Sequence, residues 1–147
     1  MPDQRRDHTP LLLDTHIWVR AFHGEMGRYR ADLTEVLDDA VASDDVRLSA
    51  IAVWEVARLV AEGRLAIRGT VDDWIAEAIV AFGGRVHPID TRVAVESTRL
   101  PALAHRDPAD RFLIATARLL DARLVTADGV LVDYGQTGNV RVLDARA

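Results

Sequence analysis

The sequence of 147 residues contains no cysteine and no lysine, and its 18 basic residues other than histidine are all arginines. Without cysteine the chain has no thiol nucleophile, no disulfide bridge and no cysteine-ligated zinc. Without lysine it lacks the amine of a Walker-type phosphate loop and the amine that forms a Schiff base with pyridoxal phosphate or carbonyl substrates. These two absences exclude whole classes of covalent catalysis and the P-loop nucleotide-binding proteins.

Long hydrophobic runs and a basic overall charge are also missing. No apolar run approaches the roughly 18 residues that cross a bilayer, and residues 1–10 hold no secretory hydrophobic region. We therefore expect a cytoplasmic protein without a membrane partner. The formal net charge is -5, so the average composition gives no sign of nucleic acid. The charge is uneven, however: residues 32–45 are strongly acidic, whereas residues 46–70 and 99–123 are each net basic.

Short apolar segments alternate with segments of helical periodicity along the chain. Strands are predicted at residues 10–13, 46–49, 85–88, 123–126 and 140–143. Amphipathic helices are predicted at residues 33–41 and 70–82, the second with Thr70 as its N-cap. Strands that alternate with helices favour a mainly parallel sheet covered on both faces, which is a three-layer α/β/α fold. We expect a polar tail at residues 1–9 and a single domain at residues 10–147.

Four of the 23 acidic residues adjoin apolar segments, unlike ordinary surface charges. Asp14 and Asp128 each follow a predicted strand, and open parallel sheets bind ligands at the carboxyl ends of their strands. Asp110 lies in the first turn of a helix that continues with almost wholly apolar residues, so this turn should lie against the sheet. Glu55 lies on a largely apolar helix, where a surface pair with Arg58 is the alternative to a role in a site.

If these four carboxylates converge, they need a positive partner. Carboxylates in one cleft repel each other, so such a cluster is tolerated mainly when a cation neutralises it. All-oxygen ligands, without cysteine and without histidines at ligand spacing, suit Mg²⁺ or Mn²⁺ better than zinc. The residues therefore predict a site for Mg²⁺ or Mn²⁺.

The segment that contains Asp110 is also typical of a helix start. Asp107 is a favourable N-cap, Pro108 suits the first helical position, and Asp110 suits the positive end of the helix dipole. Capping alone is therefore an alternative role for Asp107. The apolar residues that follow Asp110 are what set it apart from an ordinary capping acid.

Four segments together resemble the PIN domain, in particular the VapC-type toxins of bacterial toxin–antitoxin pairs. They are Leu-Leu-Leu-Asp14-Thr-His-Ile-Trp, Leu-Ser-Ala-Ile-Ala-Val-Trp-Glu55-Val-Ala, Arg-Asp107-Pro-Ala-Asp110-Arg-Phe-Leu-Ile-Ala-Thr-Ala and Leu-Val-Thr-Ala-Asp128. Each motif alone is weak, but all four occur in the family's order and at its spacing. The resemblance covers about residues 11–143, which is nearly the whole chain.

The resemblance implies an endoribonuclease that depends on Mg²⁺ or Mn²⁺. The family's acidic positions, which would hold the metal and carry the catalysis, correspond to Asp14, Glu55, Asp110 and Asp128. Thr126 occupies a position where the family often has a supporting serine or threonine. Asp107 would cap its helix and hold Asp110 and Arg111, without binding the metal. The hydrolysis would leave a 5′ phosphate and a 3′ hydroxyl.

The resemblance also implies partners, namely the RNA substrate, a VapB-type antitoxin that places a basic side chain against the acids, and a second copy in a homodimer. The apolar stripe at residues 33–41 is a candidate contact surface. Arginines that could grip RNA phosphates are Arg58, Arg64, Arg68, Arg106, Arg111 and Arg118. Trp18, Trp54 and Trp74 could stack on bases, although we expect core or interface positions for them on such apolar helices.

The sequence is also compatible with two alternatives to a toxin. One is a PIN-like module that has lost catalysis and binds RNA or a protein partner. The other is a PIN nuclease that processes RNA outside a toxin–antitoxin pair. The presence of all four acids favours the enzyme over the inactive module.

Overall fold

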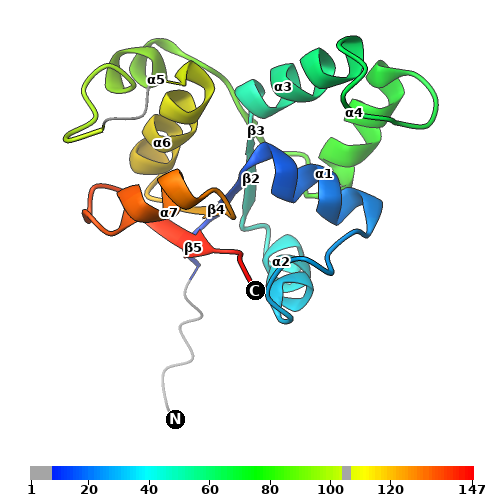
Figure 1. The fold of residues 1–147 in the computed structure, drawn as a ribbon, viewed down its shortest axis with the longest axis horizontal. Coiled ribbons are helices and arrows are strands. Elements are labelled where there is room, and N and C mark those ends of the chain that lie inside the picture. The colour runs from blue at the N-terminus through cyan, green and yellow to red at the C-terminus, as the bar shows by residue number, and fades with distance from the viewer. Residues whose placement is uncertain (1–7, 104–106) are drawn as a thin grey trace.

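The central feature of the fold is one parallel sheet of five strands in the order β3-β2-β1-β4-β5 (Figure 1). The computed structural model describes residues 8–103 and 107–147, so the predicted tail at residues 1–9 lies largely outside the described residues. Strands β1 to β5 span Leu11–Leu13, Val46–Ser49, Val86–His87, Arg123–Thr126 and Arg141–Asp144. Each predicted strand is present to within one residue at either end. All four strand pairings are parallel, which confirms the predicted mainly parallel sheet.

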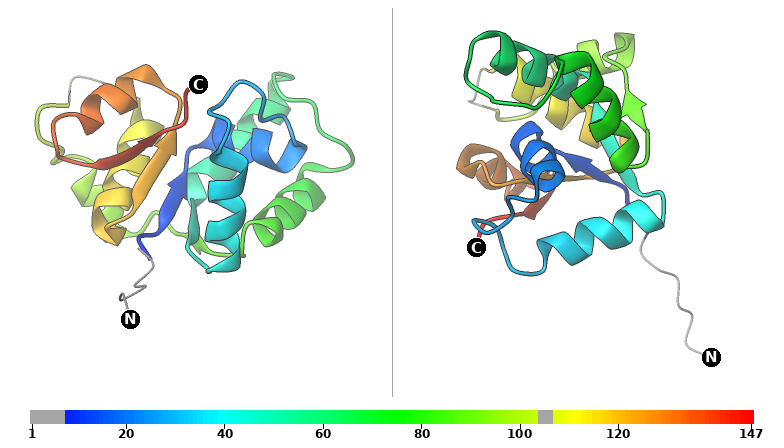
Figure 2. Two further views of the ribbon diagram at one scale, coloured as in Figure 1. Left: turned by 90° about the horizontal axis from the view of Figure 1, so that it is seen from below. Right: turned by 90° about the vertical axis from the view of Figure 1, so that its right-hand side faces the viewer.

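The helices cover both faces of this sheet, as Figures 1 and 2 show. Within the described residues, helices α1 to α7 span Thr15–His23, Leu33–Ala42, Ala50–Ala61, Val71–Ala81, Thr91–Glu96, Pro108–Leu120 and Gly129–Gly135. Helices α1, α2 and α4 lie on one side of the sheet, and α5, α6 and α7 lie on the other (Figure 1). The predicted three-layer α/β/α arrangement is therefore confirmed. None of the described helices is long and apolar enough to span a membrane.

Two hydrophobic cores form because successive residues of a strand point to opposite faces of the sheet. Leu11 and Leu13 of β1 pack in one core with α1, α2 and α4, whereas Leu12 packs in the other with α6 and α7. Helix α3 contributes Ala52 to the first core and Ile51 to the second. This helix thus adjoins both layers, and it contacts α1 as well as α6.

The two amphipathic helices predicted from periodicity are both present, but one was assigned the wrong role. Thr70 caps α4 as predicted, since its hydroxyl accepts a hydrogen bond of 3.1 Å from the Asp73 N–H. The apolar stripe at residues 33–41 is not a contact surface. Leu33 and Leu37 are buried in the core, because α2 packs this side against the sheet next to β2.

The parallel sheet gathers several chain ends at one edge. Helices α1, α3 and α7 begin directly after β1, β2 and β4, and their N-caps are Asp14, Ser49 and Asp128. Helix α6 leads into β4 and runs back against it, so its first turn lies at the same edge. Four helix N-termini, which carry partial positive charge, therefore surround the carboxyl ends of the central strands.

Candidate active site

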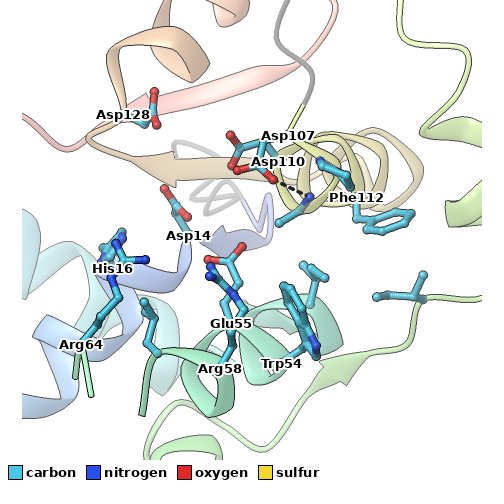
Figure 3. A pocket seen from close by; sticks show the side chains of 15 residues that line it. Asp14, His16, Trp54, Glu55, Arg58, Arg64, Asp107, Asp110, Phe112 and Asp128 are labelled. Carbon is cyan, nitrogen blue, oxygen red and sulfur yellow. Dashed lines mark hydrogen bonds between the residues drawn. The ribbon is translucent and has the colours of Figure 1, made fainter. Parts of the chain in front are cut away.

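A cleft of about 780 Å³ opens at this edge and is lined by residues of α3 and α6 (Figure 3). Its acidic lining consists of Asp14, Glu55, Asp107, Asp110 and Asp128. Basic and apolar side chains line the remainder, among them His16, Arg58, Arg64, Trp54 and Phe112. The structure therefore brings all four predicted site acids into one cleft, together with the predicted cap Asp107.

Asp14 is the most deeply placed of these acids, with 9% of the residue exposed. Its Oδ1 accepts a hydrogen bond of 2.7 Å from the Thr15 N–H, and its Oδ2 accepts one of 2.7 Å from the Thr126 hydroxyl. Burial raises the pKa of Asp14, and the hydrogen bond from Thr126 and the nearby His16 only partly oppose this rise. Asp14 is thus a fixed, poorly solvated carboxylate.

Thr126 links the ends of the two central strands. While its hydroxyl donates to Asp14, the same oxygen accepts a hydrogen bond of 3.1 Å from the Asp128 N–H. Asp128 in turn caps α7, because its Oδ1 accepts hydrogen bonds from the N–H groups of Val130 and Leu131 at 2.8 and 3.4 Å. A single threonine therefore orients one acid directly and the backbone of a second.

Glu55 reaches the cleft from the second turn of α3. Burial and the negative charge of Asp14, with smaller contributions from Asp110 and Asp107, raise its pKa to about 7. The alternative role for Glu55 was a surface ion pair with Arg58. Arg58 instead forms its ion pair with Glu62, one turn further along α3, where Nη1 lies 3.4 Å from Oε1. Glu55 is therefore part of the acidic lining, where its neighbours disfavour its ionised form.

The start of α6 follows the predicted capping pattern. Asp107 accepts a hydrogen bond of 3.0 Å from the Ala109 N–H, with Pro108 in the first turn, so the predicted cap is present. Asp110 lies in the same turn and lines the cleft. Arg111, one of the arginines predicted to grip RNA phosphates, donates from Nη1 to the Ser97 carbonyl at 3.3 Å and is not among the described residues that line the cleft. Its side chain thus joins α6 to the end of α5.

Only part of the predicted arginine set lies at the cleft. Arg58 and Arg64 line it. Arg118 pairs with a glutamate of α5, since its Nε lies 3.0 Å from the carboxylate oxygen. Arg68 lines a separate hollow beside α1 and α4, and Arg106 lies outside the described residues. The prediction for Arg118 and Arg68 is therefore wrong, because the neighbouring helices set where these side chains point.

A second hollow of about 320 Å³ adjoins the cleft and was not predicted from the sequence. It shares Asp14, His16 and Asp128 with the cleft and adds Arg20, Arg28 and Tyr29. Arg28 and Tyr29 belong to the irregular segment after α1, whose place is set by an isolated antiparallel bridge between Tyr29 and Arg146. Neither periodicity nor a motif marks such a segment, so the sequence carries no signal for it.

The acidic side chains of the cleft are of the chemical type that binds a hard cation. The carboxylate oxygens of this cleft are ligands that Mg²⁺ and Mn²⁺ favour, and the raised pKa values of Asp14 and Glu55 reflect burial and mutual repulsion that a cation would relieve. As the side chains stand, no three His, Cys, Asp or Glu residues of the described ranges form a group that could hold a metal ion. The acids share one cleft without forming a closed coordination shell.

Comparisons with known proteins agree with this architecture. Residues 11–136 match the PIN domain. Ribonuclease VapC22 of Mycobacterium tuberculosis (strain ATCC 25618 / H37Rv) is 32% identical over 122 residues, which cover 82% of this chain and 88% of that protein.

Two solved structures share the fold. FitAcB from Neisseria gonorrhoeae is 25% identical, with a TM-score of 0.62 over 91% of this chain and 96% of that chain. VapBC-5 from Mycobacterium tuberculosis, a member of the VapBC family of toxin–antitoxin systems, is 19% identical, with a TM-score of 0.60 over 93% of this chain and 99% of that chain. With a domain match across most of its length and a curated relative at 32% identity, this chain belongs to the PIN-domain family.

Proposed function

We propose that this chain is an endoribonuclease that depends on Mg²⁺ or Mn²⁺ and acts as the toxin of a toxin–antitoxin pair. The observation that carries the proposal is that Asp14, Glu55, Asp110 and Asp128, which come from separate parts of the chain, line one cleft at the carboxyl edge of the sheet. The similarity to a protein named ribonuclease VapC22 supports RNA as the substrate.

In this proposal the acids bind the cation, and neighbouring residues of the site fix the positions of the acids. Asp14 and Asp110 would be its main ligands, with Glu55 and Asp128 as further ligands. A bound divalent cation supplies the positive charge that orients the scissile phosphate and helps to ionise the attacking water. Thr126 fixes the Asp14 carboxylate, and Asp107 fixes the turn that carries Asp110.

The basic residues beside the acids would bind the substrate. Arg58 and Arg64 line the cleft on the α3 side, and Arg20 and Arg28 line the adjoining hollow on the α1 side. Phosphate contacts from arginine position a nucleic acid without selecting its sequence. An RNA strand could thus cross the carboxylates with its phosphates bound on both sides.

A VapB-type antitoxin is the proposed partner. VapBC-5, which shares the fold, belongs to a toxin–antitoxin family, and a cleft lined by five acids would attract a basic side chain of an inhibitor. The homodimer, the cytoplasmic location and the single domain over residues 10–147 remain predictions.

The direct test is RNA cleavage by the purified chain, freed of any antitoxin. We expect cleavage of single-stranded RNA with Mg²⁺ or Mn²⁺ and none with EDTA. Asp14→Asn should lower the rate by about 100-fold or more, and it should fold because asparagine also caps helices well. The matched control is Asp38→Asn, which removes an exposed acid of α2 outside the cleft and should cleave like the wild type.

Three results would contradict the proposal. Cleavage that persists in EDTA would exclude the metal dependence, and full cleavage by Asp14→Asn would exclude the acidic cleft as the active site. Binding of RNA with no cleavage in either metal would favour the inactive binding module instead.

A further inference from the structure

Trp54 is a large aromatic side chain exposed inside the cleft. It is 53% exposed, whereas Trp18 and Trp74 are 0% and 4% exposed. Of the predicted core or interface positions, Trp18 and Trp74 therefore have core positions, whereas Trp54 lies outside the core. An indole ring of this size left open to solvent beside a row of carboxylates requires its own explanation.

The position of Trp54 follows from the helical repeat of α3. Ile51, Trp54, Glu55 and Arg58 are spaced i, i+3, i+4 and i+7, so they share one face of the helix, and all four line the cleft. Figure 3 shows Trp54 next to Glu55, on the side of the cleft away from Asp128. The ring is therefore a close neighbour of the acids proposed to hold the metal.

Arg58 lies against this ring. Its guanidinium carbon is 5.2 Å from the ring centroid, which is a cation–π contact. Its Nη1 group pairs with Glu62 at 3.4 Å, while its Nε is buried and meets no hydrogen-bond acceptor among the described residues. The contact steadies the indole and places a positive charge in the same corner of the cleft.

We propose that Trp54 and Arg58 form the binding site of one unpaired nucleobase next to the scissile phosphate, which makes Trp54 a specificity-determining residue. The inference rests on the proposed ribonuclease function. Exposed aromatic rings next to cationic side chains bind single-stranded nucleic acid, because every base has a face that can stack. A base inside a duplex is already stacked and paired, so this site selects single strands and loops.

An RNA base fits this corner better than a second copy of the chain does. The other exposed large hydrophobic residues of the described ranges, apart from Ile89, lie outside the cleft; they are Val80, Val95 and Val130. The exposed apolar surface around Trp54 is therefore small for a protein interface. Arg58 and Arg64 beside it complement the charge of an RNA backbone.

The test compares two labelled single strands of eight nucleotides, oligoadenylate and the same ribose-phosphate strand without bases. Affinities are measured by fluorescence anisotropy in Ca²⁺, and cleavage is scored separately in Mg²⁺. For the wild type we expect the base-bearing strand to bind about tenfold more tightly. Trp54→Ala should bind the two strands equally, and Trp54→Phe should keep most of the preference because it keeps an aromatic face.

Val80→Ala is the control, since Val80 is 75% exposed on α4 outside the cleft; it should keep the full preference. If Trp54→Ala also keeps the preference for the base-bearing strand, the proposal that Trp54 stacks on a base is wrong. If Trp54→Ala instead turns a dimer into a monomer in light scattering and leaves the base preference intact, Trp54 belongs to an interface between copies, which also overturns the proposal.

The two readouts separate this inference from the proposed function. A chain that prefers bases through Trp54 but never cleaves contradicts the ribonuclease and supports the stacking site. A chain that cleaves but binds both strands equally contradicts the stacking site alone.

Discussion

The Thr126 hydroxyl donates a hydrogen bond of 2.7 Å to the buried Asp14 carboxylate, 112 residues away in the sequence. The two residues meet because β1 and β4 are parallel neighbours in which Leu13 pairs with Val125. Asp14 and Thr126, which follow this pair in the two segments, therefore lie side by side at the same edge of the sheet. The position of the central acid thus depends on the pairing of two distant strands.

Thr126→Val is expected to lower kcat/KM about tenfold while the protein remains folded. Valine keeps the shape of the side chain but leaves Asp14 without one of the two hydrogen-bond donors that the described residues give it. Losing a donor to a charged group costs about 1.5–3 kcal/mol, and here the loss would raise the pKa of Asp14 further and free its carboxylate to rotate. Cleavage kinetics and a thermal melt of the same sample measure the two effects.

Thr116→Val is the matched control for this change. Thr116 is also buried, and its hydroxyl donates a hydrogen bond of 2.7 Å to the Phe112 carbonyl within α6. This variant should lose a similar amount of stability and keep its activity. Equal losses of activity in both variants would show that Thr126 matters only for the fold.

The strands of the sheet and the placement of the acids in one cleft can be predicted from the sequence, because both depend on short-range patterns. Buried strands of a parallel sheet appear as short apolar runs, and Asp14 and Asp128 directly follow two of them. Once β1 and β4 are neighbours, their acids must lie at one edge. The helix start at Asp107 is equally local, since the capping carboxylate and the Ala109 N–H that donates to it lie two residues apart.

The directions of long side chains could not be predicted in this way. Arg111 and Arg118 follow a site motif in sequence, yet both turn toward α5, whose position beside α6 is a tertiary feature. Trp54 was expected in the core or at an interface because its helix is apolar, and its side chain is instead exposed in the cleft. The exposed side of α3 becomes visible only when the cleft between α3 and α6 is known.

Gly135→Ala is expected to destabilise the protein by about 1–3 kcal/mol, because overpacking a tight contact forces the backbone apart. A Cβ at Gly135 would lie 2.7 Å from Val142 Cγ2, where the end of α7 packs on β5. Thermal or urea unfolding measures the loss. Gly27→Ala is the control, since a Cβ there meets no atom within 4 Å among the described residues; an equal loss in both variants would contradict the close approach.

Substitutions should show that Asp107 contributes mainly to stability and Asp110 mainly to cleavage. Asp107→Ala removes the N-cap of α6 and should cost about 1 kcal/mol of unfolding free energy, which Asp107→Ser should restore. Asp110→Asn should leave the stability without metal unchanged or higher, because it removes a charge that disfavours ionised Glu55, and it should abolish cleavage. If Asp110→Asn destabilises the protein as much as Asp107→Ala, Asp110 is mainly a helix cap.

The raised pKa of Glu55 predicts how stability depends on pH in the absence of metal. The pKa of Glu55 is about 7 in the folded chain, against an ordinary value of 4.5, because of burial and the charge of Asp14. Between these two values the folded state binds more protons than the unfolded state, so the free energy of unfolding falls as the pH rises. The contribution of Glu55 is therefore complete below pH 4.5 and is lost as the pH rises through about 7.

Glu55→Gln removes this titration, so its stability relative to the wild type should rise between pH 4.5 and pH 7 and level off by pH 8, as measured by urea unfolding in EDTA. Adding Mg²⁺ at pH 8 should stabilise the wild type more than the variant, since a cation that binds only the folded state favours the ionised acids. Glu77→Gln, which removes an exposed carboxylate of α4 outside the cleft, is the control for the loss of one charge. A difference between Glu55→Gln and the wild type that does not change with pH would show that Glu55 is fully ionised and that the acids of the cleft do not repel each other as the geometry requires.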